Sequence, residues 1–297
     1  MARTRRFGSV HTDQKLNKLE AYLKVYSTAL KNQDFRLIYF DAFAGAGDIQ
    51  IGSNEDTLFD AIDEFSPFIE GSALRALKFA KAFDKYVFVD KKKENVEALK
   101  VLKAKYADIS DRIFVYQGDA NEEIKDFCSK TNWKRHRAVV FLDPFGNQVV
   151  WDTLDAIAAT KAIDVWYLFP AGLGVHRQIG RDGSVHFTHG AALDRILGTA
   201  EWRTAFIKAE IVSDLFEGER SESKKVANPA AITEFMIGRM RGIFKGGVLD
   251  EWIPLGTKNV HMYSLLFAWG NPSAAACKLA NTLARAVLRS STSGRAK

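Results

Sequence analysis

The sequence predicts an α/β fold in which a mostly parallel sheet carries helices on both faces. Two observations lead to this prediction. Apolar runs of strand length alternate five times with stretches of helical periodicity, and short crossovers between apolar strands require parallel neighbours. The run 37–41 ends in Asp41 and continues into Gly45 and Gly47, which is typical of the first strand-to-helix turn of a nucleotide-type domain.

The elements of the first half are expected in the following order. Residues 1–10 form a basic arm, and Thr12 with Asp13 caps a helix that runs to about Lys31, near whose start Lys15 is expected to be a surface charge. Strands are expected at 37–41, 86–90, 112–116, 138–143 and 163–169, and helices at 71–82, 94–106, 121–129 and 153–159. The polar connection 48–69 is longer than a compact strand-to-helix loop, so we interpret it as a lid or a surface excursion.

The second half is expected to interrupt and then complete the same domain. Residues 171–245 are predicted as a mostly helical insertion that could recognise a substrate. Its helices are expected near 191–197, 201–216 and 229–243, with a polar loop at 218–227. Strands at 247–254 and 260–269 then close the sheet, and a helix at 272–289 covers it. The predicted division is an α/β domain of 11–170 and 246–290, an inserted helical subdomain at 171–245, and a tail at 291–297.

Composition and charge limit the classes of protein that fit. No stretch approaches the roughly 18 apolar residues of a membrane span, and the first residues lack the apolar core of a secretory signal, so we expect a cytoplasmic protein. Cys128 and Cys277 lie far apart without ligand spacing, which favours neither a disulfide scaffold nor a metal site. The net charge of +6 favours an acidic partner such as nucleic acid, although the basic residues are scattered as on any solvated surface.

Acidic residues end four successive predicted strands. These are Asp41, Asp90, Asp119 and Asp143. Because parallel strands bring their carboxyl ends to one edge of the sheet, and ligands bind beyond that edge, the four carboxylates are expected around one site. A buried carboxylate without a partner is costly, so four such positions point to a ligand.

The glycine turn favours S-adenosylmethionine over a dinucleotide. A dinucleotide fingerprint requires a third glycine, but Gly47 is followed by Asp48, and the acid that ends the next strand lies much further along than the expected spacing of about 20 residues. A carboxylate at the end of the first strand suits a ligand with a positively charged amino acid end. A nicotinamide enzyme therefore stays the less favoured alternative.

The four acids and the glycine turn resemble the motifs of class I S-adenosylmethionine-dependent methyltransferases. The resemblance implies a Rossmann-like sheet in which strand 260–269 runs antiparallel. It also implies that Asp90 accepts hydrogen bonds from both ribose hydroxyls. The methionyl part of the cofactor would lie beside Asp41, Phe43, Gly45 and Gly47, and the adenine beside Asp119 and Ala120.

The segment Asp143-Pro144-Phe145-Gly146 resembles the motif of amino-group N-methyltransferases. The resemblance implies that the Asp143 carboxylate and the Pro144 carbonyl accept hydrogen bonds from an amino group, which aims its lone pair at the methyl group. Phe145 would stack on a base, and Gly146 would border the substrate. Phe145 directly follows a single proline, as in the tRNA guanine-N2 methyltransferases. This difference from the usual four-residue motif leaves open which atom accepts the methyl group. A rigid turn without a catalytic role is the alternative interpretation.

Basic residues follow the fifth predicted strand at the same edge of the sheet. We predict that Arg177 and Arg181 contact a substrate phosphate. Three histidines also lie there, His176, His186 and His189, but they lack the periodicity of metal ligands. No metal is therefore expected.

Six segments along nearly the whole chain resemble the three-Cys-motif partner (TcmP) family. They begin at His11, Asp41, Phe141, Trp166, Ile196 and Tyr263, and read HTDQKL, DAFAGAG, FLDPFG, WYLFPAGLGVHR, ILGTAEW and YSLLFA. The resemblance implies a methyltransferase-like protein with a genomic partner that carries a three-cysteine motif. A non-catalytic, cofactor-binding partner subunit is the alternative to an active methyltransferase of nucleic acid.

Overall fold

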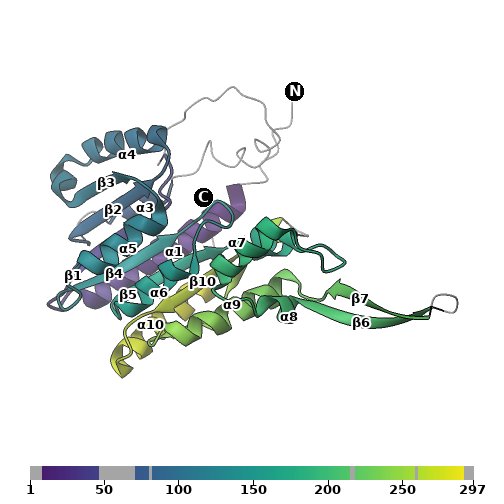
Figure 1. Ribbon diagram of the computed structural model, residues 1–297. Coiled ribbons are helices and arrows are strands. Elements are labelled where there is room, and N and C mark those ends of the chain that lie inside the picture. The colour runs from purple at the N-terminus through teal and green to yellow at the C-terminus, as the bar shows by residue number, and fades with distance from the viewer. Residues whose placement is uncertain (1–8, 47–70, 80–81, 215–217, 258–259, 291–297) are drawn as a thin grey trace, which may run out of the picture.

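The computed structural model describes residues 9–46, 71–79, 82–214, 218–257 and 260–290 (Figure 1). The predicted arm 1–10 lies almost entirely outside these residues, as do Gly47, the connection 48–69 and the tail 291–297. No helix among the described residues is long and apolar enough to cross a membrane.

One eight-stranded sheet forms the centre of the molecule, with the strand order β3-β2-β1-β4-β5-β10-β8 and with β9 paired to β10. The strands are β1 (Arg36–Asp41), β2 (Lys85–Asp90), β3 (Ile113–Gln117), β4 (His136–Leu142), β5 (Ile163–Phe169), β8 (Gly247–Val248), β9 (Ile253–Thr257) and β10 (Val260–Trp269). Strands β1 to β5 are parallel, and β10 runs antiparallel to β5. The predicted Rossmann-like class of fold, with an antiparallel closing strand, is confirmed. The single strand predicted at 247–254 is instead the two short strands β8 and β9.

Helices cover both faces of this sheet because successive strand residues point to opposite sides. On β1, Tyr39 packs toward one face and Phe40 toward the other. The first face is covered by α1 (Ser9–Leu30), α3 (Ser72–Leu77), α4 (Lys93–Lys105) and α10 (Ala274–Arg289). The second face is covered by α5 (Ala120–Lys130), α6 (Trp151–Ala159), α7 (Phe187–Leu197), α8 (Trp202–Phe206) and α9 (Pro229–Ile243).

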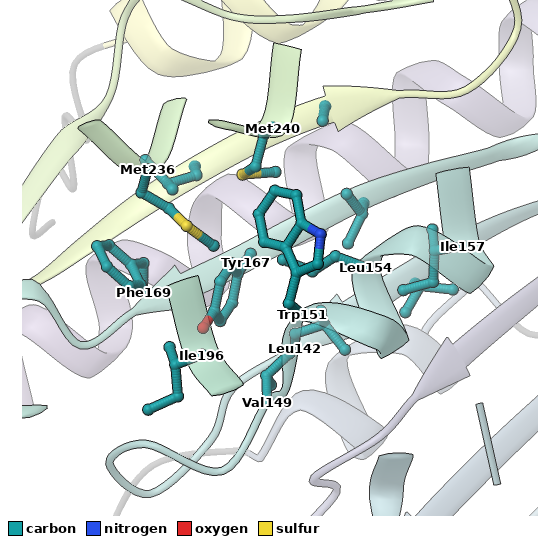
Figure 2. Close-up of a cluster of buried hydrophobic side chains, with 14 of the residues drawn as sticks. Leu142, Val149, Trp151, Leu154, Ile157, Tyr167, Phe169, Ile196, Met236 and Met240 are labelled. Atoms are coloured by element: carbon teal, nitrogen blue, oxygen red, sulfur yellow. The ribbon is translucent and has the colours of Figure 1, made fainter. Parts of the chain in front are cut away.

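The core of the second face joins the segment 171–245 to the sheet. Figure 2 shows Met236 and Met240 of α9 pointing toward Tyr167 of β5 and Trp151 of α6. These side chains belong to one continuous cluster of buried hydrophobic residues. Helix α9 is thus part of the layer that covers the sheet. The predicted division into domains stays a prediction.

The helix predicted at 201–216 and the loop predicted at 218–227 are wrong. Helix α8 ends at Phe206, and the chain continues as β6 (Ile207–Asp214) and β7 (Gly218–Lys225), which pair antiparallel from Ile207↔Lys225 to Asp214↔Gly218. This two-stranded ribbon extends away from the sheet (Figure 1). The β-branched residues Ile207, Ile211 and Val212 favour extended backbone, so a short apolar run that fits helical spacing folds as a strand.

Two predicted helix boundaries on the first face also need correction. Helix α1 begins at Ser9, so Thr12 and Asp13 lie inside it rather than at its cap. No glycine or proline separates Ser9 from Thr12 in the sequence, so nothing stops the helix from starting earlier. Helix α3 ends at Leu77 instead of continuing to residue 82.

Gly198 holds the join between α7 and α8 and gives a stability prediction. It caps α7 with a φ of +65°, and an added Cβ would lie 2.1 Å from Cγ of Trp151. We expect Gly198→Ala to lower the free energy of unfolding by about 2–4 kcal/mol, because left-handed backbone and overpacking are both costly for alanine. Chemical denaturation followed by circular dichroism measures this difference.

Gly238 in α9 provides the matched control. An added Cβ there meets nothing within 4 Å, and the residue is helical. Gly238→Ala is expected to raise the free energy of unfolding by about 0.5–1 kcal/mol, because alanine favours the helix. Equal effects of the two substitutions would contradict the packing argument.

Candidate functional site

A cavity of about 640 Å³ lies at the carboxyl ends of the parallel strands. Three of the four strand-end acids line it, namely Asp90, Asp119 and Asp143. Phe43, Ala120 and Phe145 also line it, as the sequence predicts, together with Lys91, Lys92, Asn95, Asn121 and Gln148, which sequence reasoning missed. The sheet therefore brings together most of the predicted cofactor residues and the predicted catalytic acid.

Asp90 at the end of β2 fixes the turn after β1. Its Oδ2 accepts a hydrogen bond from the backbone N–H of Gly45 at 3.0 Å, and its Oδ1 accepts one from the N–H of Lys92 at 2.8 Å. Gly45 has a φ of +62°, which only glycine adopts without strain. Because a carboxylate has about four lone pairs, Asp90 keeps acceptor capacity on the side that faces the cavity.

Asp41 lies beneath the cavity and does not line it. The residue is fully buried, and its carboxyl group accepts hydrogen bonds from the Tyr39 hydroxyl at 3.2 Å and from the Phe43 N–H at 3.3 Å. Burial raises the pKa of Asp41 to about 7, the negative charge of Asp143 adds to this, and a hydrogen bond from Ser72 opposes it. Contact of Asp41 and Gly45 with a cofactor stays a prediction.

Asp119 and Asn121 connect the turns that follow β3 and β4. Asp119 caps α5 by accepting from the Asn121 N–H at 2.9 Å. The Asn121 amide donates to the Gln148 carbonyl at 2.9 Å and accepts from the Val150 N–H at 3.1 Å and the Thr153 hydroxyl at 2.8 Å. These bonds hold the two turns together on one side of the cavity.

Asp143 forms an ion pair with Lys15, a residue predicted from the sequence to be a surface charge. The Lys15 Nζ lies 2.5 Å from the Asp143 Oδ2, and the side chains are only 15% and 20% exposed. Lys15 comes from α1, whose Leu16, Leu19 and Tyr22 are buried against the first face of the sheet. The surface assignment is thus wrong, since the helix that packs on the sheet also carries a cation to its carboxyl edge.

The turn after Asp143 exposes an aromatic ring. Phe145 is 55% exposed, and its backbone N–H donates to the Gln148 side chain at 2.9 Å. Pro144 is buried, and Gly146 has a φ of +72°. Both amide atoms of Asn147 are buried without a hydrogen-bond partner among the described residues. An amide without partners costs about 1–3 kcal/mol.

Arg177 and Arg181 are exposed and do not line the cavity. Burial raises the pKa of Tyr263 to about 12, the charge of Asp143 adds to this, and the charge of Arg177 opposes it. The Arg181 carbonyl accepts from the Lys225 N–H at 3.0 Å, at the base of the ribbon. The contact of either arginine with a phosphate stays a prediction.

Metal ligands do not gather in the part of the chain that the structure describes. No group of three or more histidine, cysteine, aspartate or glutamate side chains there could hold a metal ion.

No family model and no curated protein matches the chain. One similar solved structure is protein LPL1258 from Legionella pneumophila, with 14% identity, a TM-score of 0.48, and coverage of 93% of this chain and 91% of that one. Another is magnesium protoporphyrin IX methyltransferase from Synechocystis with bound SAM, with 11% identity, a TM-score of 0.34, and coverage of 76% and 87%. A third is spermidine synthase from Thermotoga maritima, with 11% identity, a TM-score of 0.30, and coverage of 84% and 70%. The class of fold rests on the strand order itself.

Proposed function

We propose that the protein transfers a methyl group from S-adenosylmethionine to an amino nitrogen of a nucleic acid. The observation that carries the proposal is the position of Asp143. Its carboxylate lines the same cavity as Asp90, beside an exposed phenylalanine and against the Lys15 ammonium group. A carboxylate and an aromatic ring at one edge of a cofactor-sized cavity suit the orientation of an amino group on a planar base.

The residues at the cavity fit S-adenosylmethionine. The volume of about 640 Å³ lies within the range for small-molecule sites, and Asp90 has acceptor capacity for ribose hydroxyls. Asp119 and Ala120 would border the adenine, and Phe43 would border the methionyl end. When bound, the cofactor would supply a methyl group that its sulfonium already activates: the amine nitrogen takes the methyl group, the thioether S-adenosylhomocysteine leaves, and the surplus proton of the methylated amine passes to water, so no strong base is needed to begin the reaction.

The residues of the turn would hold the acceptor amine. Lys15 occupies Oδ2 of Asp143, so Oδ1 and the Pro144 carbonyl are the acceptors we assign to the two N–H bonds of the amine. Two such hydrogen bonds fix the direction of the nitrogen lone pair. Phe145 would stack on the base, which requires a single-stranded or flipped nucleotide. Gly146 leaves the turn free of a side chain beside that base.

A nucleic acid is the proposed acceptor because an exposed aromatic ring at the site suits a planar base and the net positive charge of the chain suits a polyanion. The chain has a net charge of +6, and Arg177 follows β5, whose carboxyl end lies at the same edge of the sheet as that of β4. Arg177 and Arg181 would contact phosphates on either side of the reactive nucleotide. The proposal includes membership of the three-Cys-motif partner family and a partner protein that carries the three-cysteine motif.

Binding of S-adenosylhomocysteine tests the cofactor assignment. Isothermal titration calorimetry with S-adenosylmethionine, S-adenosylhomocysteine and NAD is expected to give micromolar binding of the first two alone. Asp90→Ala should weaken that binding by about 30-fold or more, because hydrogen bonds to a charged acceptor contribute about 1.5–3 kcal/mol each. Asp111→Ala is the matched control, since Asp111 is exposed in the turn before β3, at the opposite edge of the sheet.

The outcomes separate the candidate functions. Binding of NAD in place of S-adenosylmethionine would contradict the proposal. Binding of S-adenosylhomocysteine without methyl transfer to any RNA or DNA, with and without the three-cysteine partner, would establish the non-catalytic subunit instead. Transfer of a radiolabelled methyl group to nucleic acid would establish the enzyme.

A further inference from the structure

A second cavity, of about 450 Å³, lies at the opposite edge of the sheet. It is bounded by α1 and α10 and by the amino ends of β4 and β5. The two cavities share no lining residue, so this one plays no part in the proposed transfer. Parallel strands carry their proposed active site at the carboxyl edge, and nothing in that chemistry requires a cavity at the amino edge.

Its walls are mostly aromatic and aliphatic. Tyr22 and Tyr26 of α1 line one side, with Phe35 before β1 and Trp269 at the end of β10. Leu279 and Leu283 of α10 line the other side. An apolar cavity of this size with a few convergent polar groups is the usual form of a small-molecule site.

The polar groups of the cavity come from residues that face one another across strands. Asp164 of β5 pairs with Trp269 of β10, so their side chains lie on the same face of the sheet. Asp164 accepts a hydrogen bond from the Tyr22 hydroxyl at 2.7 Å through Oδ2, and no other hydrogen bond to this carboxylate occurs among the described residues. The indole N–H of Trp269 is buried, and it too lacks a partner within the described part of the chain.

Arg137 supplies a positive charge close to this carboxylate. Its Nη1 donates to the carbonyls of Trp133 at 2.8 Å and His136 at 2.7 Å, and its guanidinium lies 3.8 Å above the Phe35 ring. Burial raises the pKa of Asp164 to about 7, while the Tyr22 hydrogen bond and the charge of Arg137 oppose the rise. Within the described residues, no hydrogen bond joins Arg137 directly to Asp164.

These charges select the class of ligand. When Asp164 is ionised, a cationic ligand would be attracted by Asp164 but repelled by Arg137, and an anionic ligand would be attracted by Arg137 but repelled by Asp164, so neither can satisfy both groups. A neutral group with an N–H beside a C=O can donate to Asp164 and accept from Arg137 at once. We propose that this cavity is a second ligand site, for a neutral, largely aromatic molecule with an amide-like edge, such as a carboxamide, a lactam or a heterocyclic base.

Three probes of the same shape and different charge test the proposal. We would titrate the full chain with 2-naphthamide, 2-naphthoate and 2-naphthylmethylamine and follow binding by ligand-observed nuclear magnetic resonance. The neutral amide is expected to bind about 10-fold more tightly than either charged probe, because an unmatched buried charge or polar group costs at least that much. A charged probe that binds as tightly as the amide, or no saturable binding of the amide, would overturn the proposal.

Two substitutions on α10 locate the binding. Ala276 lines the cavity, so Ala276→Phe should fill it and weaken naphthamide binding by about 10-fold or more. Ala274, on the same helix, is exposed and does not line it, so Ala274→Phe is expected to leave binding unchanged. Equal binding to both variants would place the amide elsewhere and contradict the assignment. The charge series on the unmodified protein decides the ligand class even if Ala276→Phe folds poorly.

Discussion

Replacing Asp143 with asparagine is expected to lower the rate constant of methyl transfer by about 100- to 1,000-fold, the range seen when one positioned electrostatic contact is removed. Asparagine keeps the size of the side chain. It lacks the negative charge that pairs with Lys15 and that strengthens the hydrogen bond from the amine. Single-turnover transfer of a radiolabelled methyl group measures the loss. Because Asp143 acts on the acceptor, S-adenosylhomocysteine affinity should change little.

Lys15 completes this test as a positioning residue. Lys15→Met removes the charge that holds Oδ2 of Asp143, and Lys15→Arg keeps a charge in its place. We expect the methionine variant to lower the rate and the arginine variant to restore part of it. The two side chains act as a unit. The activation free energy should therefore rise less in the variant that combines Asp143→Asn with Lys15→Met than the sum of the two single increases. Strict additivity would show that the pair does not act together.

Replacing Asp164 with asparagine is expected to change how the free energy of unfolding depends on pH. The pKa of Asp164 is about 7 in the folded protein, mainly because of burial, and the unfolded value is close to 4. The folded protein therefore holds this proton where the unfolded chain has released it. The contribution of Asp164 to the free energy of unfolding is therefore fully present below about pH 4 and is lost as the pH rises toward 7.

Asp164→Asn cannot ionise and escapes this loss. Relative to the unmodified protein, the variant should gain about 2–3 kcal/mol in free energy of unfolding between pH 5 and pH 8. Its amide oxygen can still accept from the Tyr22 hydroxyl, so the contact in α1 is retained. Urea denaturation at the two pH values measures the gain. The same difference between the proteins at both pH values would show that Asp164 titrates normally.

Sequence periodicity predicted the sheet because its strands are buried on both faces and read as continuous apolar runs. The same rule placed Asp90, Asp119 and Asp143 at one edge, since the carboxyl ends of parallel strands coincide. Asp41 also lies at the carboxyl edge of the sheet, yet its side chain is buried beneath the cavity, because a residue at a strand end can point to either side of the sheet. In the folded chain, the Asp41 carboxyl group accepts hydrogen bonds from the Tyr39 hydroxyl and the Phe43 N–H, which no sequence pattern reveals.

Contacts between distant parts of the chain were beyond prediction. Lys15 and Asp143 are 128 positions apart, and nothing near Lys15 in the sequence marks it as different from the other lysines of α1. The ribbon of β6 and β7 was missed for another reason. Its first strand carries apolar residues at 207, 211 and 212, a spacing that fits one side of a helix as well as an extended segment, and only pairing with the polar second strand decides between them.

The Asn121 link between the turns after β3 and β4 bears on the order in which ligands bind. One amide joins the end of the cavity assigned to adenine with the turn that carries Phe145 and Gln148. Under the proposed function, the turn assigned to the acceptor is held in place before adenine binds, and preorganisation of this kind lowers the entropy lost on binding. If the proposed function holds, we therefore expect a random kinetic order, in which neither ligand must wait for the other.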